Sequence, residues 1–139
     1  MLQEWKDLLE KGASIDTEDV LGHTLLYEAA SNGDIKSASL LIEWNAKIDA
    51  VAKNGCTPLF ISSLHGHLSI VRILLARGAD YNVRSPEYGT PLSGAAWGGY
   101  TDICRILLES GATVDTARDS GSTPLYIACL LYTSPSPRD

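Results

Sequence analysis

The sequence has few cysteines and no excess of basic residues. Its 139 residues contain Cys56, Cys104 and Cys129, and an odd number of cysteines without C-x-x-C spacing supports neither a disulfide framework nor a zinc site. The formal net charge is −6, and no run of Lys or Arg offsets it. Sequence-independent binding to nucleic acid needs such residues to replace the counterions of the phosphates. We therefore expect a reducing compartment and no nucleic-acid partner.

Long apolar segments and catalytic signatures are also missing. No stretch approaches the roughly 18 consecutive apolar residues of a membrane-spanning helix, and the first residues, MLQEWKDLLEKG, are unlike a signal peptide. The sequence has no G-x-S-x-G, no P-loop and no H-E-x-x-H motif. We expect a soluble intracellular chain, cytoplasmic or nuclear, with no membrane partner, no enzymatic activity and no cofactor.

What the sequence does contain is one pattern that recurs at a fixed spacing. The segments TLLYEAASNGD, TPLFISSLHGH, TPLSGAAWGGY and TPLYIAC begin at Thr24, Thr57, Thr90 and Thr123, each 33 residues after the one before. A second set of positions keeps the same spacing: Gly12-Ala13, Asn45-Ala46, Gly78-Ala79 and Gly111-Ala112. Two sets in phase without an insertion indicate a repeat architecture.

Each repeat predicts a turn followed by two short antiparallel helices. In residues 52–84, Thr57 is suited to cap a helix and Pro58 to occupy its first position, where no N–H donor is needed. Gly66 ends that helix and Gly78 ends the next one. The second helix has four apolar residues on one face: Leu68, Val71, Leu74 and Leu75. Because one such pair buries too little apolar surface to be stable alone, the copies are expected to stack into a solenoid.

The T-P-L motif, the G-H pair, the I-V-x-x-L-L-like run and the G-A-D ending resemble the ankyrin repeat family over nearly all of residues 2–128. The resemblance implies an all-α solenoid of stacked helix-turn-helix units with projecting β-turn fingers. We assign residues 1–128 to one ankyrin repeat domain, with a half unit at 1–18, full units at 19–51, 52–84 and 85–117, and a half unit at 118–128. The first half unit, with Trp5, Leu8 and Leu9 at core positions, resembles a capping repeat, and the start of a truncated fragment is an equal alternative.

Three departures from the family pattern affect local structure. Asn45 replaces the glycine that ends the second helix, and Asn also enters the left-handed conformation. The turn glycine of the third finger is shifted to Gly89, with Tyr88 in its place, which predicts a finger of different shape. The residue after T-P-L or T-L-L is commonly His in the family, but none of the units has His there: the residues are Tyr27, Phe60, Ser93 and Tyr126.

Residues 129–139, CLLYTSPSPRD, break the repeat phase abruptly. The string can be encoded by a nucleotide sequence that resembles a transposase-based sequencing-library adapter. We predict that it is a non-native tail with no part in the function. The alternative is a natural disordered tail.

The family resemblance implies that partners contact the fingers and the exposed ends of the first helices. The candidates on the helices are Asn32, Leu64, His65 and Trp97. Those in the fingers are His23, Lys53, Asn54, Arg84, Glu87 and Tyr88. Leu64 and Trp97 are 33 residues apart and are expected side by side as an apolar strip, a common sign of a partner surface. The alternative is that Trp97 covers Tyr100 or the helix of the next repeat, since single exposed apolar residues are common.

Histidines and cysteines are expected to have structural roles. His67 matches the family's G-H pair, in which the imidazole bonds neighbouring turns, and no carboxylate or thiol lies at ligand spacing from the histidines, so no metal site is expected. Cys104 is predicted in the core. Cys56 lies in a finger and is predicted to be more exposed and open to oxidation, without a cationic neighbour to lower its pKa.

The expected function is that of a monomeric scaffold or adaptor that binds a partner protein, and a stack this short is expected to lack a deep pocket. One alternative is a regulatory segment of a larger enzyme, channel or transcriptional regulator. The other is a structural spacer in a long repeat array.

Overall fold

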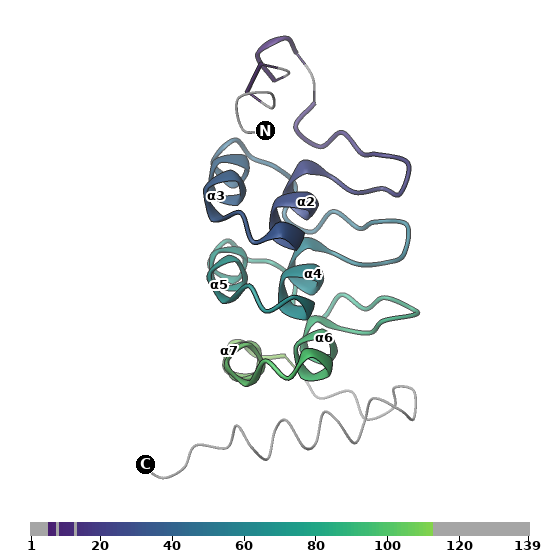
Figure 1. Ribbon diagram of the computed structural model, residues 1–139, viewed down its shortest axis with the longest axis vertical. Coiled ribbons are helices and arrows are strands. Elements are labelled where there is room, and N and C mark those ends of the chain that lie inside the picture. Colours follow the sequence, from purple (N-terminus) through teal and green to yellow (C-terminus); the bar gives the residue numbers. More distant parts are fainter. Residues whose placement is uncertain (1–5, 8, 13, 113–139) are drawn as a thin grey trace.

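The computed structural model describes residues 6, 7, 9–12 and 14–112. Six helices, α2 to α7, form three consecutive pairs: α2 (Leu25–Asn32) with α3 (Ile35–Glu43), α4 (Pro58–Leu64) with α5 (Leu68–Ala76), and α6 (Pro91–Gly98) with α7 (Thr101–Ser110). Figure 1 shows the pairs stacked along the long axis, with α2, α4 and α6 in one column and α3, α5 and α7 in the other. The described residues contain no β-strand, only an isolated bridge between Ser85 and Gly89. The expected all-α solenoid is confirmed.

Threonine side chains start the helices of the first column. The hydroxyl oxygens of Thr24 and Thr57 each accept a hydrogen bond, 3.2 Å long, from the backbone N–H three residues ahead, and that of Thr90 accepts an equivalent one of 3.3 Å. These bonds satisfy one of the N–H groups that a helix leaves without a partner at its start. In the second column, a residue in the left-handed conformation follows each helix: Asn45 after α3, Gly78 after α5 and Gly111 after α7. Asn45 has a φ of 67°, as its replacement of glycine predicts.

The core repeats with the sequence period. Leu26, Leu59 and Leu92 occupy equivalent positions in the first column, and each is at most 1% exposed. The second column buries an equivalent set to the same degree: Leu41, Leu74 and Leu107. All six leucines belong to one core cluster that runs through the three helix pairs, so the pairs share the apolar surface that none of them could cover alone. On the predicted face of α5, Val71 and Leu74 are fully buried while Leu68 and Leu75 are half-buried.

Hydrogen bonds between units repeat as well. The carboxylate of Asp16 accepts from the backbone N–H of Lys47 at 2.8 Å, and that of Asp49 accepts from the N–H of Asp80 at 3.0 Å. A ring nitrogen of His67 lies 3.0 Å from the carbonyl oxygen of Ser31 in the preceding unit. The structural role expected for His67 is therefore confirmed.

The third finger differs from the first two, as the shifted glycine predicts. In the first finger the N–H of Gly22 donates to the carbonyl of Asp19, and in the second the N–H of Gly55 donates to Ala52, closing a turn in each case. In the third finger Ser85 and Gly89 exchange two backbone hydrogen bonds of 2.8 and 2.9 Å. Residues 86–88 therefore form the tip of a small antiparallel loop.

Several predicted features lie outside the described residues. They are Trp5, Leu8, Tyr126, Cys129, the half unit 118–128 and the tail 129–139. No helix in the described part of the chain is long and apolar enough to cross a membrane.

Candidate partner-binding surface

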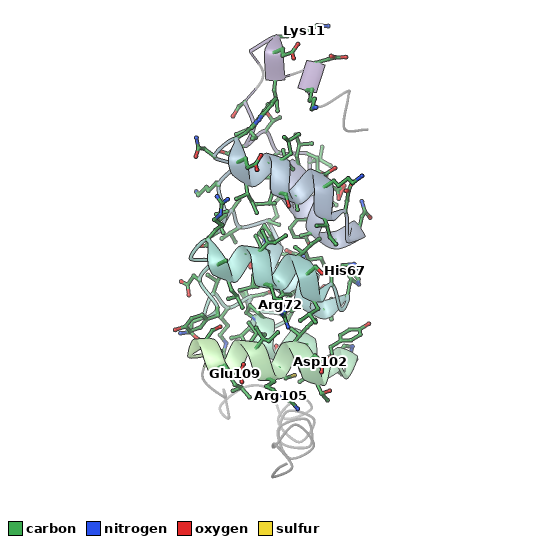
Figure 2. All side chains as sticks on the ribbon, turned by 90° about the vertical axis from the view of Figure 1, so that its left-hand side faces the viewer. Lys11, His67, Arg72, Asp102, Arg105 and Glu109 are labelled. Atoms are coloured by element: carbon green, nitrogen blue, oxygen red, sulfur yellow. The ribbon has the colours of Figure 1, made fainter. Side chains whose placement is uncertain are left out.

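The fingers and the first-column helices form one continuous surface. We call it the inner face and define it by the fingers 19–23, 52–56 and 85–89 together with the exposed sides of α2, α4 and α6. Figure 1 shows the fingers projecting beside this column. On the opposite side, Figure 2 shows α5 and α7 carrying charged residues of both signs, Arg72, Asp102, Arg105 and Glu109, all exposed. The outer face is thus charged and exposed to solvent, whereas the inner face carries Leu64 and Trp97, the apolar candidates for partner binding.

Leu64 and Trp97 lie at the ends of α4 and α6, and they share one pocket. Leu64 is half-buried, whereas Trp97 is 69% exposed. The pocket has a volume of about 380 Å³. Seven residues line it: Phe60, Leu64, Glu87, Tyr88, Ser93, Gly94 and Trp97. The structure therefore brings two predicted finger residues, Glu87 and Tyr88, to the predicted Leu64/Trp97 strip.

The pocket exists because the third unit lacks a large side chain. Tyr27 and Phe60 occupy equivalent positions in the first two units and are 5% and 3% exposed. Ser93 stands at that position in the third unit, so no ring fills the space beside the finger. Next to it, a Cβ atom at Gly94 would lie 3.1 Å from Cε2 of Phe60 and 3.5 Å from Cβ of Leu64. The bare backbone at Gly94 therefore packs directly on Phe60 and keeps the pocket open.

Two serine hydroxyls hold the finger wall of the pocket. Oγ of Ser85 donates to the carbonyl of Asn54 at 2.6 Å and accepts from the N–H groups of Glu87 and Tyr88 at 3.3 and 3.2 Å. Oγ of Ser93 lies 2.9 Å from the carbonyl oxygen of Tyr88. The Tyr88 ring lies tilted against Phe60, with centroids 6.2 Å apart. The backbone that presents Glu87 and Tyr88 is thus ordered before any partner arrives, which lowers the entropic cost of binding.

Comparison with known proteins identifies the architecture. A family model described as ankyrin repeats in three copies matches residues 3–85, and a model of a single ankyrin repeat matches residues 89–120. The chain belongs to the ankyrin repeat family. A search of the curated proteins found no match. Ankyrin repeats generally act as protein–protein interaction modules and are typically non-catalytic.

The other residues predicted to contact a partner are either exposed or hydrogen-bonded within their own finger. Asn32, Lys53, His65 and Arg84 are exposed on the inner face. Asn54 is half-buried, and its side-chain oxygen accepts from the N–H of Cys56 at 3.0 Å. Asn54 therefore has a role in the turn itself, and a contact between any of these residues and a partner stays a prediction.

Cys56 is buried at the base of the second finger, contrary to prediction. It is 2% exposed and belongs to the core cluster, because it directly precedes the helix cap Thr57 at the base of the finger. Burial is the main cause that raises the pKa of its thiol above the ordinary value. The prediction of an exposed, oxidisable cysteine was wrong, whereas Cys104 is fully buried as predicted.

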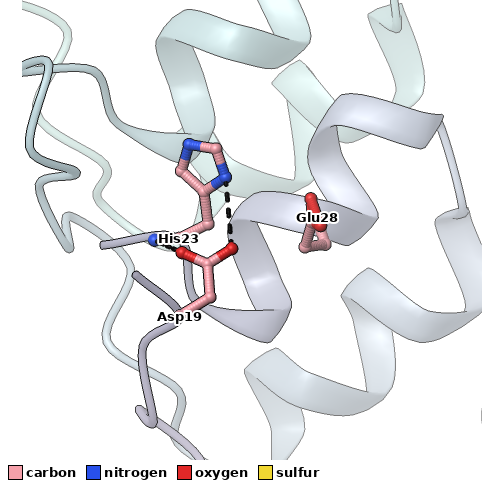
Figure 3. A group of neighbouring side chains, drawn as sticks. All are labelled: Asp19, His23 and Glu28. Carbon is pink, nitrogen blue, oxygen red and sulfur yellow. Dashed lines mark hydrogen bonds and ion pairs between the residues drawn. The ribbon is translucent and has the colours of Figure 1, made fainter. Parts of the chain in front are cut away.

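The surroundings of His23 are a second correction. Its ring stacks on Tyr27 with centroids 4.1 Å apart, and Nδ1 lies 3.6 Å from a carboxylate oxygen of Asp19. Figure 3 shows Asp19 turned toward His23, with Glu28 on the neighbouring helix, and one ligand atom from each of the three residues lies within 4.8 Å of the others. The prediction that no carboxylate lies at ligand spacing from the histidines was wrong, because the finger and the first turn of α2 bring Asp19 and Glu28 to the His23 ring.

The Asp19 carboxylate is nevertheless already used by the finger. One of its oxygens accepts from the N–H groups of Leu21 and His23, both at 2.9 Å. The bond from the His23 N–H is the main cause that lowers the pKa of Asp19, and burial opposes it. One imidazole and two carboxylates are suitable ligands for a divalent cation. The turn alone accounts for the position of Asp19, and the expected absence of a metal ion stays a prediction.

Proposed function

We propose that this ankyrin domain is a protein-interaction scaffold that binds a partner protein through its fingers and inner face, with Trp97 at the centre of the contact. The observation that carries the proposal is a Trp side chain that is 69% exposed beside a pocket with aromatic and aliphatic walls. Tryptophan is among the residues most enriched at the energetic centres of interfaces. The hydrogen-bonded finger next to it supplies a surface that needs little ordering on binding.

The alternatives make different predictions about the same surface. A regulatory segment of a larger enzyme, channel or transcriptional regulator would also use the inner face, and its partner would be part of that larger assembly. A spacer in a long array would bind nothing. A structural role for Trp97 on Tyr100 would leave less of its ring exposed than the observed 69%, whereas packing on the helix of the next repeat concerns residues outside the described part of the chain.

Site-specific photocrosslinking tests the proposal. The photoreactive amino acid p-benzoylphenylalanine replaces Trp97 in one variant and Trp44 in the control. Trp44 follows α3 and is 39% exposed, so it matches Trp97 in residue type but not in position. We expect a discrete protein adduct from position 97 in cell extract and none from position 44. Mass spectrometry of the adduct identifies the partner.

Binding of the purified partner then provides the quantitative test. Trp97→Ala is expected to weaken binding about tenfold or more, as for an interface centre worth at least about 1.4 kcal/mol. Trp44→Ala is expected to leave the affinity within about twofold. An absence of adducts at both positions favours the spacer, and a partner that binds Trp97→Ala with unchanged affinity contradicts the proposal.

A further inference from the structure

The pocket beside Trp97 has mainly apolar walls and a single charged residue. Phe60, Leu64, Tyr88 and Trp97 give it aromatic and aliphatic walls. Among its seven lining residues, all within the described part of the chain, Glu87 is the only one with a side chain that is charged at neutral pH. The Glu87 side chain is exposed at the finger. The pocket therefore combines apolar walls with one negative charge and no positive one.

A long cationic side chain matches this combination better than other side chains do. Lysine and arginine bury an apolar stem while keeping the charged end near a polar group. A cation also interacts favourably with the faces of Trp and Tyr rings. A purely aliphatic side chain would gain from the walls but would take the Glu87 carboxylate out of water without offering it a new partner. An acidic side chain would be repelled by that carboxylate.

The net charge of the chain and the size of the pocket both agree with a basic occupant. The chain has a net charge of −6, so basic segments are attracted over a distance and acidic ones are repelled. Glu87 already takes part in an interaction within the chain. A carboxylate offers about four lone-pair sites, so it has room for a cationic donor beside that interaction. The volume of about 380 Å³ lies in the lower part of the range of roughly 300–1,000 Å³ typical of ligand pockets.

We propose that the Phe60/Leu64/Tyr88/Trp97 pocket takes a lysine or arginine side chain from a basic segment of the partner protein, with Glu87 binding the cationic end. This inference rests on the proposed function and adds the chemistry of the partner to it. Ser93 and Gly94 select for a long side chain because they leave space for it. Glu87 selects for a positive charge over a neutral or negative one. The first two units cannot offer the same site, because Tyr27 and Phe60 fill the equivalent position.

A peptide panel on the unmodified chain tests the inference without any risk of misfolding. The probes are capped peptides Gly-Ser-Gly-X-Gly-Ser-Gly in which X is arginine, lysine, norleucine or glutamate. They are titrated to about 10 mM into ¹⁵N-labelled chain, and the indole N–H signal of Trp97 is followed by NMR, with that of Trp44 as the internal reference. We expect the arginine and lysine peptides to shift the Trp97 signal with a Kd about fivefold or more below that of the norleucine peptide.

A single substitution then assigns the preference to the finger carboxylate. In Glu87→Gln the preference for arginine and lysine over norleucine is expected to fall to about twofold or less, because the cationic peptides lose the carboxylate and norleucine no longer takes a charged group out of water. Raising the salt concentration from 0.05 to 0.5 M is expected to weaken the cationic peptides and not norleucine. Peptides that shift Trp97 and Trp44 equally would indicate diffuse charge attraction and overturn the inference.

The failure of this inference differs from that of the proposed function. If norleucine binds as tightly as lysine or more tightly, the pocket takes an apolar side chain, and the inference is overturned while the scaffold function stands. If no peptide shifts Trp97, the inference is also overturned, and the crosslinking result alone decides the scaffold function.

Discussion

Gly33→Ala offers a sharp test of how neighbouring units are joined. Gly33 follows α2 with a φ of 74°, and an added Cβ would lie 2.7 Å from two atoms of the His67 ring. The substitution therefore imposes two costs. The left-handed backbone costs about 1–2 kcal/mol for a residue with a side chain. Displacing the ring from the Ser31 carbonyl loses a further hydrogen bond worth about 0.5–1.5 kcal/mol.

Gly78→Ala separates these two costs. Gly78 has a φ of 83°, but no described atom lies within 4 Å of the position of its added Cβ. It should show the backbone cost alone. In urea unfolding followed by circular dichroism, Gly33→Ala is therefore expected to lose about 1.5–3.5 kcal/mol and Gly78→Ala about 1–2 kcal/mol. In a His67→Ala background the two should become equal. Equal losses in the unmodified background would refute the role given to His67.

Three further predictions concern the core and the helix caps. Leu74→Ala should cost about 2–5 kcal/mol in urea unfolding, because Leu74 is fully buried in the core cluster, and an unshifted midpoint would contradict the assigned phase of α5. Asp34 caps α3, and hydrogen bonds from the hydroxyl and N–H of Ser37 lower its pKa below 3.8. Its contribution is present above the unfolded pKa and is lost as the pH falls through the lower folded value, so the stability advantage over Asp34→Ala should shrink below about pH 4 and be constant at neutral pH. Cys56 should react with a thiol reagent at neutral pH only in urea, because burial raises the pKa of its thiol, and rapid labelling of Cys56 in the folded chain, located by peptide mapping, would contradict its burial.

The repeat fold could be predicted because its determinants are local and periodic. The threonine caps and the buried leucines recur every 33 residues, so a correct prediction of the helices in one unit also predicts those of the other units. The role of His67 followed from its place in the G-H pair. Cys56 was misassigned because its position in a finger was taken as exposure. The base of a finger is in fact packed against the core.

The pocket could be predicted only in part. The 33-residue spacing placed Leu64 and Trp97 together, and the shifted Gly89 indicated a different finger. The missing step was the volume that Ser93 leaves where Tyr27 and Phe60 have rings. That consequence depends on the finger approaching the helix, which is a tertiary contact held by Ser85 and Ser93. Likewise, the approach of Asp19 and Glu28 to His23 arises from the turn of the finger and not from a recognisable ligand spacing.

The measurement that tests the central claim most directly is the affinity of the crosslinked partner for the unmodified chain, Trp97→Ala and Trp44→Ala, with the thermal midpoint of each variant. The scaffold function predicts that Trp97→Ala weakens binding about tenfold or more while its midpoint falls by no more than a few degrees, and that Trp44→Ala binds normally. Unchanged affinity of Trp97→Ala would contradict the claim. A large fall in its midpoint would instead show that Trp97 belongs to the core.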